Sequence, residues 1–281
     1  MKNSLPKAAD MRIDQQQIDK YRDDGFLIFP DLVSEAEVEI LRGELDRLSA
    51  IDCSYTRRSP NGSILTLYRV HEDYGPTQSP AFRALCRLPR TLGIARQLMD
   101  TDSAYIFHTK INMKLAVEGP MWSWHQDYGG GWKFDGVPTP DIMTCLVLLD
   151  DADELGGALY VVPGSHKQGS LDAMDDSSVT AVNKYSLPRK ALIDTLRAHK
   201  PVPISCKRGT VVFFHSNLIH GSGHNMSGFD RRQIYIVYNP VENQPPESAR
   251  TREDHVSSKN YAAIPVEADD GIVRSAGPGR A

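Results

Sequence analysis

The spacing of hydrophobic positions in the N-terminal part of the chain predicts helices around one short strand. Residues 13–22 follow a helical pattern, and the apolar run at 26–29, closed by Pro30, is typical of a strand. Ser34 and Glu37 have the spacing of a capping box. The other predictions here are a loosely held lead-in over 1–13, an amphipathic helix over 38–48, a loop over 52–64 and a helix over 85–99.

After residue 104 the pattern changes to short apolar runs bounded by Gly, Pro, Asn or Asp, which predict strands. Because no long helix separates most of these runs, they favour an antiparallel sandwich or barrel. A polar excursion over 167–200, with a helix at 189–199, predicts a lid between two strands, and the residues after about 269 predict a flexible tail. The predicted strands are 105–107, 111–115, 143–149, 158–162, 210–214 and 234–238.

The composition is that of an ordinary globular protein. The 281 residues are 40% hydrophobic, and 32 Lys and Arg against 36 Asp and Glu give a net charge of −4. Interspersed charges argue against nucleic acid as a partner, and no apolar stretch fits a signal peptide or a membrane span. We expect one cytoplasmic domain over 1–281, with a helical support over about 13–100 and a jelly-roll core over about 104–240. Whether it is a monomer or a homodimer stays open.

The four cysteines lie far apart and form no C-x-x-C pair. They therefore predict neither a zinc ribbon nor a dense disulfide framework, and we expect reduced thiols. These residues are Cys53, Cys86, Cys145 and Cys206.

Two histidines and one aspartate have the pattern of a metal-binding set. His125 and Asp127 are two residues apart, so in an extended strand both side chains point to the same face. A similar pair, His71 and Asp73, lies in a polar segment and is better explained as a solvated surface pair. His125 lies between aromatic residues, and His220 follows an apolar strand in a segment that contains glycines. Two imidazoles and one carboxylate, with three coordination positions open, are typical of a non-haem Fe(II) oxygenase.

An oxygenase of this kind that uses 2-oxoglutarate needs a cation for the far carboxylate of that co-substrate. Arg231 lies shortly after His220, at the start of a predicted strand, and a guanidinium matches a carboxylate bidentately. Arg232 is a rival candidate. Strand parity places Arg231 on the same face as Gln233, and Arg232 on the same face as Ile234. These residues alone leave open which face lines the pocket.

Four segments carry a resemblance to a known family: Asp-Gly-Phe-Leu at 24–27, Trp-His-Gln-Asp at 124–127, Val-Pro-Gly-Ser-His at 162–166 and His-Gly-Ser-Gly-His-Asn at 220–225. They resemble the phytanoyl-CoA dioxygenase family of Fe(II)- and 2-oxoglutarate-dependent oxygenases, and the similarity covers nearly the whole chain. The resemblance implies a mainly β fold with flanking α-helices, whose core is a double-stranded β-helix, the cupin-like distorted jelly roll. It also implies Fe(II), with 2-oxoglutarate and O₂ as co-substrates.

The same resemblance implies a role for each matching residue. The two histidines and the aspartate described above become the iron ligands, namely His125, Asp127 and His220. The family's arginine falls on Arg231 rather than Arg232. Ser222 is expected to help hold the same carboxylate, and Asn112 is expected to contact the co-substrate near the metal.

Within the family, the segments 124–138 and 238–243 are most similar to the branch of ectoine hydroxylase and leucine 5-hydroxylase. Those enzymes hydroxylate small amino acids or their derivatives at unactivated carbons. Ectoine hydroxylase has Phe-Glu-Thr-Trp-His after its aspartate, whereas here Asp127 is followed by Tyr-Gly-Gly-Gly-Trp, which argues against ectoine itself. The three glycines predict either close backbone approach in a wider pocket or a flexible turn without a role.

Four further side chains are candidates for contacts with the substrate. Tyr128 and Trp132 either close over the substrate or belong to the core. His108 and Lys110 share the strand parity of Asn112 and are therefore candidates to face the pocket. His166, in its Pro-Gly-Ser-His turn, is expected to be structural.

The resulting hypothesis is an enzyme that hydroxylates a small amino acid or an amino-acid-derived metabolite and releases succinate and CO₂. Two alternatives stay open. The same cofactor chemistry could desaturate, epoxidise or cyclise a secondary metabolite, or the protein could be a jelly-roll that binds metal without turnover.

Overall fold

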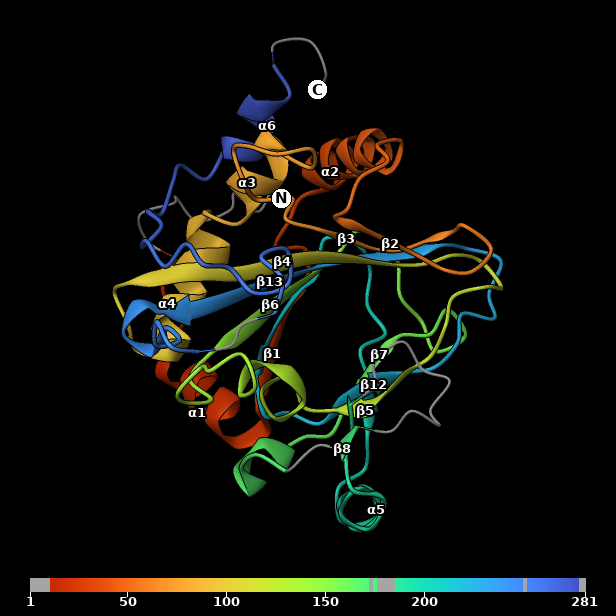
Figure 1. Ribbon diagram of the computed structural model, residues 1–281, viewed down its shortest axis with the longest axis vertical. Coiled ribbons are helices and arrows are strands. Elements are labelled where there is room, and N and C mark those ends of the chain that lie inside the picture. The colour runs from red at the N-terminus through yellow and green to blue at the C-terminus, as the bar shows by residue number, and fades with distance from the viewer. Residues whose placement is uncertain (1–10, 172–173, 176–184, 250–251, 278–281) are drawn as a thin grey trace, which may run out of the picture.

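The computed structural model describes residues 11–171, 174–175, 185–249 and 252–277, and an antiparallel sheet forms its centre (Figure 1). The strands of this larger sheet are β1 (Phe26–Phe29), β2 (Thr56–Arg58), β3 (Ile64–Tyr68), β4 (Ala104–Lys114), β6 (Met143–Leu148), β11 (Val211–His215) and β13 (Arg231–Pro240). Their spatial order is β1-β11-β6-β13-β4-β3-β2, so most neighbours are far apart in the sequence.

A smaller sheet faces the larger one. Its strands are β5 (Trp122–His125), β7 (Leu159–Val161), β10 (Val202–Pro203) and β12 (His220–Ser222), in the order β10-β7-β12-β5. A separate short pair consists of β8 (Met174–Asp175) and β9 (Tyr185–Ser186). Apolar side chains of both sheets, among them Leu146, Val161 and Phe214, form one buried cluster. The predicted mainly β fold with a jelly-roll core is confirmed.

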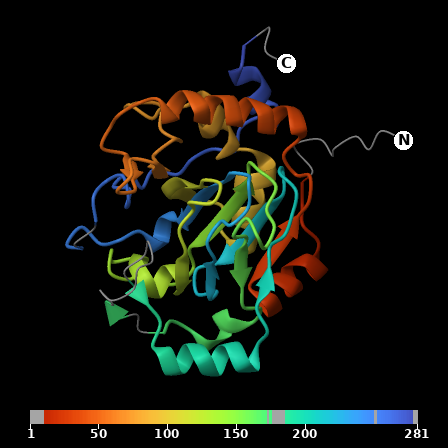
Figure 2. The ribbon, with the colours of Figure 1, turned by 90° about the vertical axis from the view of Figure 1, so that its right-hand side faces the viewer.

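Helices cover the outer side of the larger sheet, and one helix lies beside the smaller sheet. The helices are α1 (Gln15–Asp24), α2 (Glu35–Ser49), α3 (Pro80–Leu85), α4 (Ile94–Met99), α5 (Arg189–Ala198) and α6 (Gly271–Ser275). Short π-helical turns occur at η2 (Pro89–Gly93) and η3 (Tyr128–Trp132), and 3-10 turns at η4 (Ser165–Gln168) and η5 (Val241–Asn243). Residues of α2, α3 and α4 share a core cluster with the larger sheet, whereas α5 packs beside the smaller one (Figure 2).

Local sequence signals explain several of these boundaries. The Ser34 hydroxyl accepts a hydrogen bond from the Glu37 amide, and the Glu37 carboxylate accepts one from the Ser34 amide, which confirms the predicted capping box of α2. The helix predicted over 85–99 is wrong at its start, because α3 begins at Pro80 and ends before Pro89. Leu88 is extended, as expected for a residue before proline, so the chain breaks there and resumes as η2 and α4.

Two predicted boundaries in the β region also need correction. The loop predicted over 52–64 contains β2 and leads into β3, which pair as an antiparallel hairpin. The two strands predicted at 105–107 and 111–115 are one continuous strand, β4. Of the three polar residues that separate the two apolar runs, His108 and Lys110 line an interior cavity and Thr109 contacts His71 on the other side of the strand.

Parts of the predicted lid and lead-in lie outside the described residues, namely 172–173, 176–184 and 1–10. The helix predicted at 189–199 is confirmed as α5. All four cysteines are unpaired. Within the described ranges, no helix has both the length and the apolar character that crossing a membrane requires.

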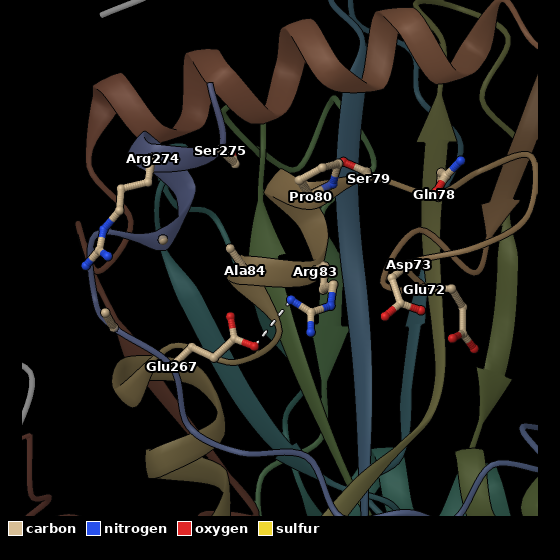
Figure 3. A pocket seen from close by; sticks show the side chains of 12 residues that line it. Glu72, Asp73, Gln78, Ser79, Pro80, Arg83, Ala84, Glu267, Arg274 and Ser275 are labelled. Atoms are coloured by element: carbon tan, nitrogen blue, oxygen red, sulfur yellow. Dashed lines mark ion pairs between the residues drawn. The ribbon is translucent and has the colours of Figure 1, made fainter. Parts of the chain in front are cut away.

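The predicted flexible tail after residue 269 is wrong, because α6 packs against the N-terminal helices. Ile272 is completely buried in the core cluster that includes α2 and α3. Just before α6, the Glu267 carboxylate pairs with Arg83 at 3.3 Å and with Arg87 at 3.0 Å. Figure 3 shows α6 beside α3, with the Arg83–Glu267 pair. The side chains drawn there line a cavity of about 630 Å³. The burial of Ile272 and the ion pairs of Glu267 therefore hold α6 in place, although the helical pattern of this short segment is weak.

Replacing Ile272 by alanine should lower the free energy of unfolding by about 2–5 kcal/mol, because it leaves a cavity in a filled core. The adjacent Val273 is 40% exposed, so Val273→Ala is a matched control that should change stability by less than about 0.5 kcal/mol. Urea denaturation of both variants measures the difference. Equal stability of the two variants would show that α6 is not part of the cooperative core.

Candidate active site

Three side chains from different elements meet at one end of the smaller sheet. His125 is the last residue of β5 and lies opposite His220, the first residue of β12. Asp127 follows two residues after His125, directly before η3. The Nε2 atoms of His125 and His220 lie 3.7 and 3.8 Å from the two carboxylate oxygens of Asp127. One ligand atom from each residue lies within 4.8 Å of the others, so the three could hold a metal ion.

The reason for this convergence differs from the strand parity used to predict it. Only His125 is extended, while Asp127 has helical dihedral angles (φ −65°, ψ −44°). The carboxylate therefore reaches the imidazoles by a turn of the backbone at the end of β5. Thr144 on β6 donates a hydrogen bond to Asp127 Oδ2 (3.3 Å) and helps to orient it.

Backbone carbonyls determine which ring nitrogen of each histidine faces the centre. Nδ1 of His125 lies 2.7 Å from the Ser123 carbonyl, and Nδ1 of His220 lies 2.9 Å from the Leu218 carbonyl. Because a carbonyl can only accept, both Nδ1 atoms carry the proton, and both Nε2 lone pairs are available to a metal. The donor set of two neutral imidazoles and one carboxylate fits Fe(II) with open coordination positions.

Burial favours the protonation states that a metal requires. Burial, with the nearby His220, lowers the pKa of His125 to about 3, and burial also lowers the pKa of His220. Burial raises the pKa of the Asp127 carboxyl, but His220, Lys110 and His125 outweigh it and leave that pKa below its usual range. Neutral histidines and an ionised aspartate are therefore expected at neutral pH.

The rival pair at 71 and 73 does not join this site, although its surroundings differ from the prediction. His71 is buried rather than solvated, and its Nδ1 lies 2.8 Å from the Thr109 hydroxyl. Its neighbour Glu72 pairs with Arg69 at 2.8 Å. Burial lowers the pKa of His71 to about 3, so it is a neutral histidine of the core.

A row of polar side chains follows the inner faces of β4 and β13. The pairing register places Arg231 opposite Lys114, Gln233 opposite Asn112 and Tyr235 opposite Lys110. The opposite face carries apolar residues that contact the helices. The hydrophobic alternation along β13 thus turns Arg231 inward, where it is 2% exposed.

Arg232 lies on the other face and is already paired. Its guanidinium donates to both carboxylate oxygens of Asp150, at 2.7 and 2.9 Å, and to Asp46 at 3.3 Å. The sequence left open which of the two arginines faces the interior. Burial shows that it is Arg231.

Some buried hydrogen-bond donors of this inner row have no acceptor among the described residues. Arg231 donates to the Gln233 side chain, but Arg231 Nε and Gln233 Nε2 have no hydrogen-bond partner among the described residues. Lys114 donates to the Ser222 hydroxyl (2.8 Å), and burial together with Arg231 lowers the pKa of Lys114 to about 6. A buried guanidinium and a buried amine, neither with a carboxylate partner in the described part of the chain, form a place where a bound anion would be stabilised and would favour the protonated form of Lys114.

Strand parity places both Asn112 and Lys114 in this row. Asn112 is buried in this row and accepts a hydrogen bond from Thr66 (3.1 Å). Lys114 was missed by the sequence reasoning, although its parity with Asn112 and Lys110 could have identified it.

A cavity of about 540 Å³ opens beside the three metal-binding candidates. Of the four predicted substrate residues, His108, Lys110 and Trp132 line it. Tyr128 does not, because its hydroxyl donates to the carbonyls of Val137 and Pro138 (3.1 and 3.0 Å) within an aromatic cluster. The cavity also has lining residues that the sequence reasoning missed: Arg57, Tyr68, Trp122, Gln126, Arg252, Glu253 and Val256.

Most of the missed residues come from segments distant in sequence. Arg252 lies after the last strand of the jelly roll and donates to both oxygens of the buried Asp135. No local motif marks this residue. The ammonium of Lys110 lies 5.9 Å from the ring centre of Trp122 and 5.2 Å from that of Tyr235, so aromatic faces partly replace its water.

Close approach of the Leu171 backbone explains Gly129, whereas the nearest neighbour of Gly131 is a side chain. A Cβ atom at Gly129 would lie 2.8 Å from the Leu171 carbonyl oxygen, and one at Gly131 would lie 3.0 Å from the Arg252 guanidinium. His166 lies in η4, with Nε2 3.1 Å from the Arg22 carbonyl, and the structural role predicted for it agrees with this contact.

Comparisons with known proteins agree with this geometry. A model of the phytanoyl-CoA dioxygenase family matches residues 21–233. The ectoine dioxygenase of Bordetella bronchiseptica is 30% identical over 258 residues, which are 86% of this chain and 82% of that protein. The L-proline trans-4-hydroxylase of Streptomyces griseoviridis is 29% identical over 263 residues, with 89% of this chain and 95% of that protein covered.

A solved structure shows the same fold. EctD from S. alaskensis, crystallised with 2-oxoglutarate and 5-hydroxyectoine, superposes with a TM-score of 0.79 at 27% identity, over 92% of this chain and 88% of that one. A second crystal structure of EctD from S. alaskensis, with bound Fe, gives a TM-score of 0.77. This chain therefore belongs to the phytanoyl-CoA dioxygenase family and is a 2-oxoglutarate-dependent iron dioxygenase.

Proposed function

We propose that this protein hydroxylates a small amino acid, or a metabolite derived from one, at an unactivated carbon, and releases succinate and CO₂. The observation that carries the proposal is the cavity of about 540 Å³ beside His125, Asp127 and His220, which lies within the range of small-molecule sites. Two of the similar proteins, ectoine dioxygenase and L-proline trans-4-hydroxylase, are named for substrates of this size and class.

The residues described above divide into two sets with different tasks. His125, Asp127 and His220 would hold Fe(II), which activates O₂ and 2-oxoglutarate for attack on a C–H bond. Arg231 and Ser222 would hold the far carboxylate of 2-oxoglutarate, with Lys114 as a further hydrogen-bond donor and Asn112 nearer the metal. The supporting observation is that the unpaired donor capacity of Arg231 and Gln233 is buried in this row.

The lining of the cavity favours a substrate that carries a carboxylate. Lys110, Arg57 and Arg252 supply cationic groups, and Trp122 and Trp132 supply aromatic faces. A carboxylate can accept hydrogen bonds from such cations, while the rings enclose a small apolar body. An amino acid or imino acid combines both properties.

The test is succinate formation by Fe(II)-reconstituted protein in air, with 2-oxoglutarate and a panel of L-amino acids, cyclic imino acids and ectoine. We expect substrate-dependent succinate together with a product heavier by one oxygen atom for at least one amino acid. A product lighter by two hydrogen atoms would instead identify desaturation or cyclisation. His125→Ala serves as the control for background 2-oxoglutarate consumption.

Two negative results would contradict the proposal in different ways. Succinate at the His125→Ala level for every member of the panel, but above it with larger metabolites, would overturn the substrate class. Failure to consume 2-oxoglutarate under any condition would favour a metal-binding protein without turnover.

A further inference from the structure

His108 on β4 has one ring nitrogen occupied by the backbone of a distant segment. Its Nδ1 lies 2.9 Å from the Val256 carbonyl oxygen. That carbonyl is held in place, because the Val256 amide donates to the Glu253 carbonyl (2.8 Å) and the Ser258 amide donates to the Phe107 carbonyl (2.9 Å). Since a carbonyl can only accept, His108 Nδ1 must carry the proton and donate it. The Val256 carbonyl thus selects one tautomer of His108.

The other ring nitrogen of His108 is a buried acceptor without a partner. The residue is 4% exposed, and its Nε2 has no hydrogen bond to any described residue. His108 lines the cavity beside the metal-binding candidates, where its ring lies 6.0 Å from that of Trp132 at an angle of 70°. A buried acceptor that loses its water and gains no donor costs free energy, so such atoms usually have a partner in the working state of a protein.

The polar groups around this nitrogen make it unusual in the cavity. Lys110, Arg57 and Arg252 carry donors only, and the indole nitrogens of Trp122 and Trp132 are also donors. Asp127 is an acceptor, but it belongs to the metal-binding set, and Glu253 is exposed. The side-chain oxygen of Gln126 already accepts from the Leu171 amide (2.8 Å), and the Tyr68 hydroxyl can both donate and accept. Burial and the positive charges of Lys110 and Arg252 also hold the pKa of His108 well below its usual value, so the ring stays neutral.

We propose that His108 Nε2 accepts a hydrogen bond from an N–H group of the substrate and thereby selects primary and secondary amines over fully N-substituted analogues. This inference rests on the proposed function and names the feature by which an amino acid is recognised. The carboxylate of the substrate meets the cationic part of the cavity, and its nitrogen meets His108. His108 is therefore a positioning residue that sets which carbon of the substrate lies toward the metal.

The test compares each substrate with an analogue that has no N–H group. The matched pairs are L-proline with N,N-dimethyl-L-proline, and L-leucine with N,N,N-trimethyl-L-leucine. Binding is measured anaerobically with Fe(II) and 2-oxoglutarate by the fluorescence of Trp122 and Trp132, which line the cavity. Turnover in air then gives kcat and KM separately. The variants are His108→Phe, which removes the acceptor, and His108→Gln, which retains one.

For the pair whose parent compound is turned over, the wild-type protein should bind the N–H form about 10- to 100-fold more tightly than the methylated form. His108→Phe should lose that preference and raise KM for the amino acid by a similar factor. The KM for 2-oxoglutarate should change less than about threefold, because other residues hold that co-substrate. His108→Gln should retain most of the preference, and His224→Phe, at an exposed histidine, should behave as wild type.

The possible failures can be distinguished. A wild-type protein that is active on an amino acid but binds its methylated analogue equally well overturns the role of His108 and leaves the proposed function intact. Unchanged selectivity in a folded His108→Phe variant does the same. A wild-type protein that is silent toward every amino acid overturns the proposed function, and this inference with it.

Discussion

Replacing Asp127 by asparagine should lower 2-oxoglutarate-dependent turnover by at least about a thousandfold. Loss of a residue that only orients a metal ligand costs about 10- to 100-fold, so loss of the anionic ligand itself should cost more. Asparagine retains the volume of Asp127 and can still accept the hydrogen bond from Thr144, so the backbone at the end of β5 should not move. The substitution removes the negative charge between two neutral imidazoles and puts N–H donors where a metal requires a lone pair.

Fe(II) titration and succinate assays measure this effect directly. Thermal unfolding of the metal-free proteins should give nearly equal melting temperatures, which separates lost chemistry from lost folding. His224→Asn is the matched control, because His224 lies close to His220 in the sequence but is exposed and outside the metal-binding set. Full activity of Asp127→Asn, or a comparable loss in His224→Asn, would show that the metal is held elsewhere.

The metal-binding set could be predicted because its members differ chemically from their neighbours in the sequence. His125 and Asp127 interrupt an aromatic run, and His220 follows an apolar strand. The pairing of β12 with β5 brings His220 opposite His125, and no local pattern contains that register. Before the structure, the two motifs were connected by the chemistry of two imidazoles and one carboxylate, and then by the resemblance to a family.

The rest of the cavity depends on contacts that a sequence period does not encode. Tyr128 has a side chain that is typical of substrate contacts. Its hydroxyl, however, donates to the carbonyls of Val137 and Pro138, which come close to it only through the turn at η3. Arg252 and Val256 reach the cavity because the chain returns alongside β4 after the jelly roll is complete. Likewise, α6 is held by the burial of Ile272 in a core formed by helices far earlier in the chain. In each of these cases, contacts between segments distant in the sequence determine where the residue lies.

Strand parity was informative for β4 and β13, where it reduced the choice of arginine to two faces without deciding between them. The apolar residues after Arg232 were the missing signal, since Ile234 and Ile236 are completely buried against the helix-covered face. When helices cover one face of a strand and the other face lines a polar interior, the apolar residues of the alternating pattern lie under the helices. Arg231 therefore belongs to the polar interior.

Because the two arginines lie on opposite faces of β13, replacing each by lysine should affect the binding of 2-oxoglutarate differently. Arg231→Lys retains the charge but loses the planar fork that can bind a carboxylate with two parallel hydrogen bonds, so KM for 2-oxoglutarate should rise about 10- to 100-fold. Arg232→Lys breaks a bidentate pair with Asp150 on the outer face, so KM for 2-oxoglutarate should change less than about threefold.

Steady-state kinetics with varied 2-oxoglutarate distinguish the two arginines, and addition of excess 2-oxoglutarate should restore much of kcat in Arg231→Lys. That recovery separates weakened co-substrate binding from a general loss of structure, which excess co-substrate would not repair. A rise in KM confined to Arg232→Lys would contradict the assignment. It would mean that the anion site suggested by the buried donors of Arg231, Gln233 and Lys114 has another ligand.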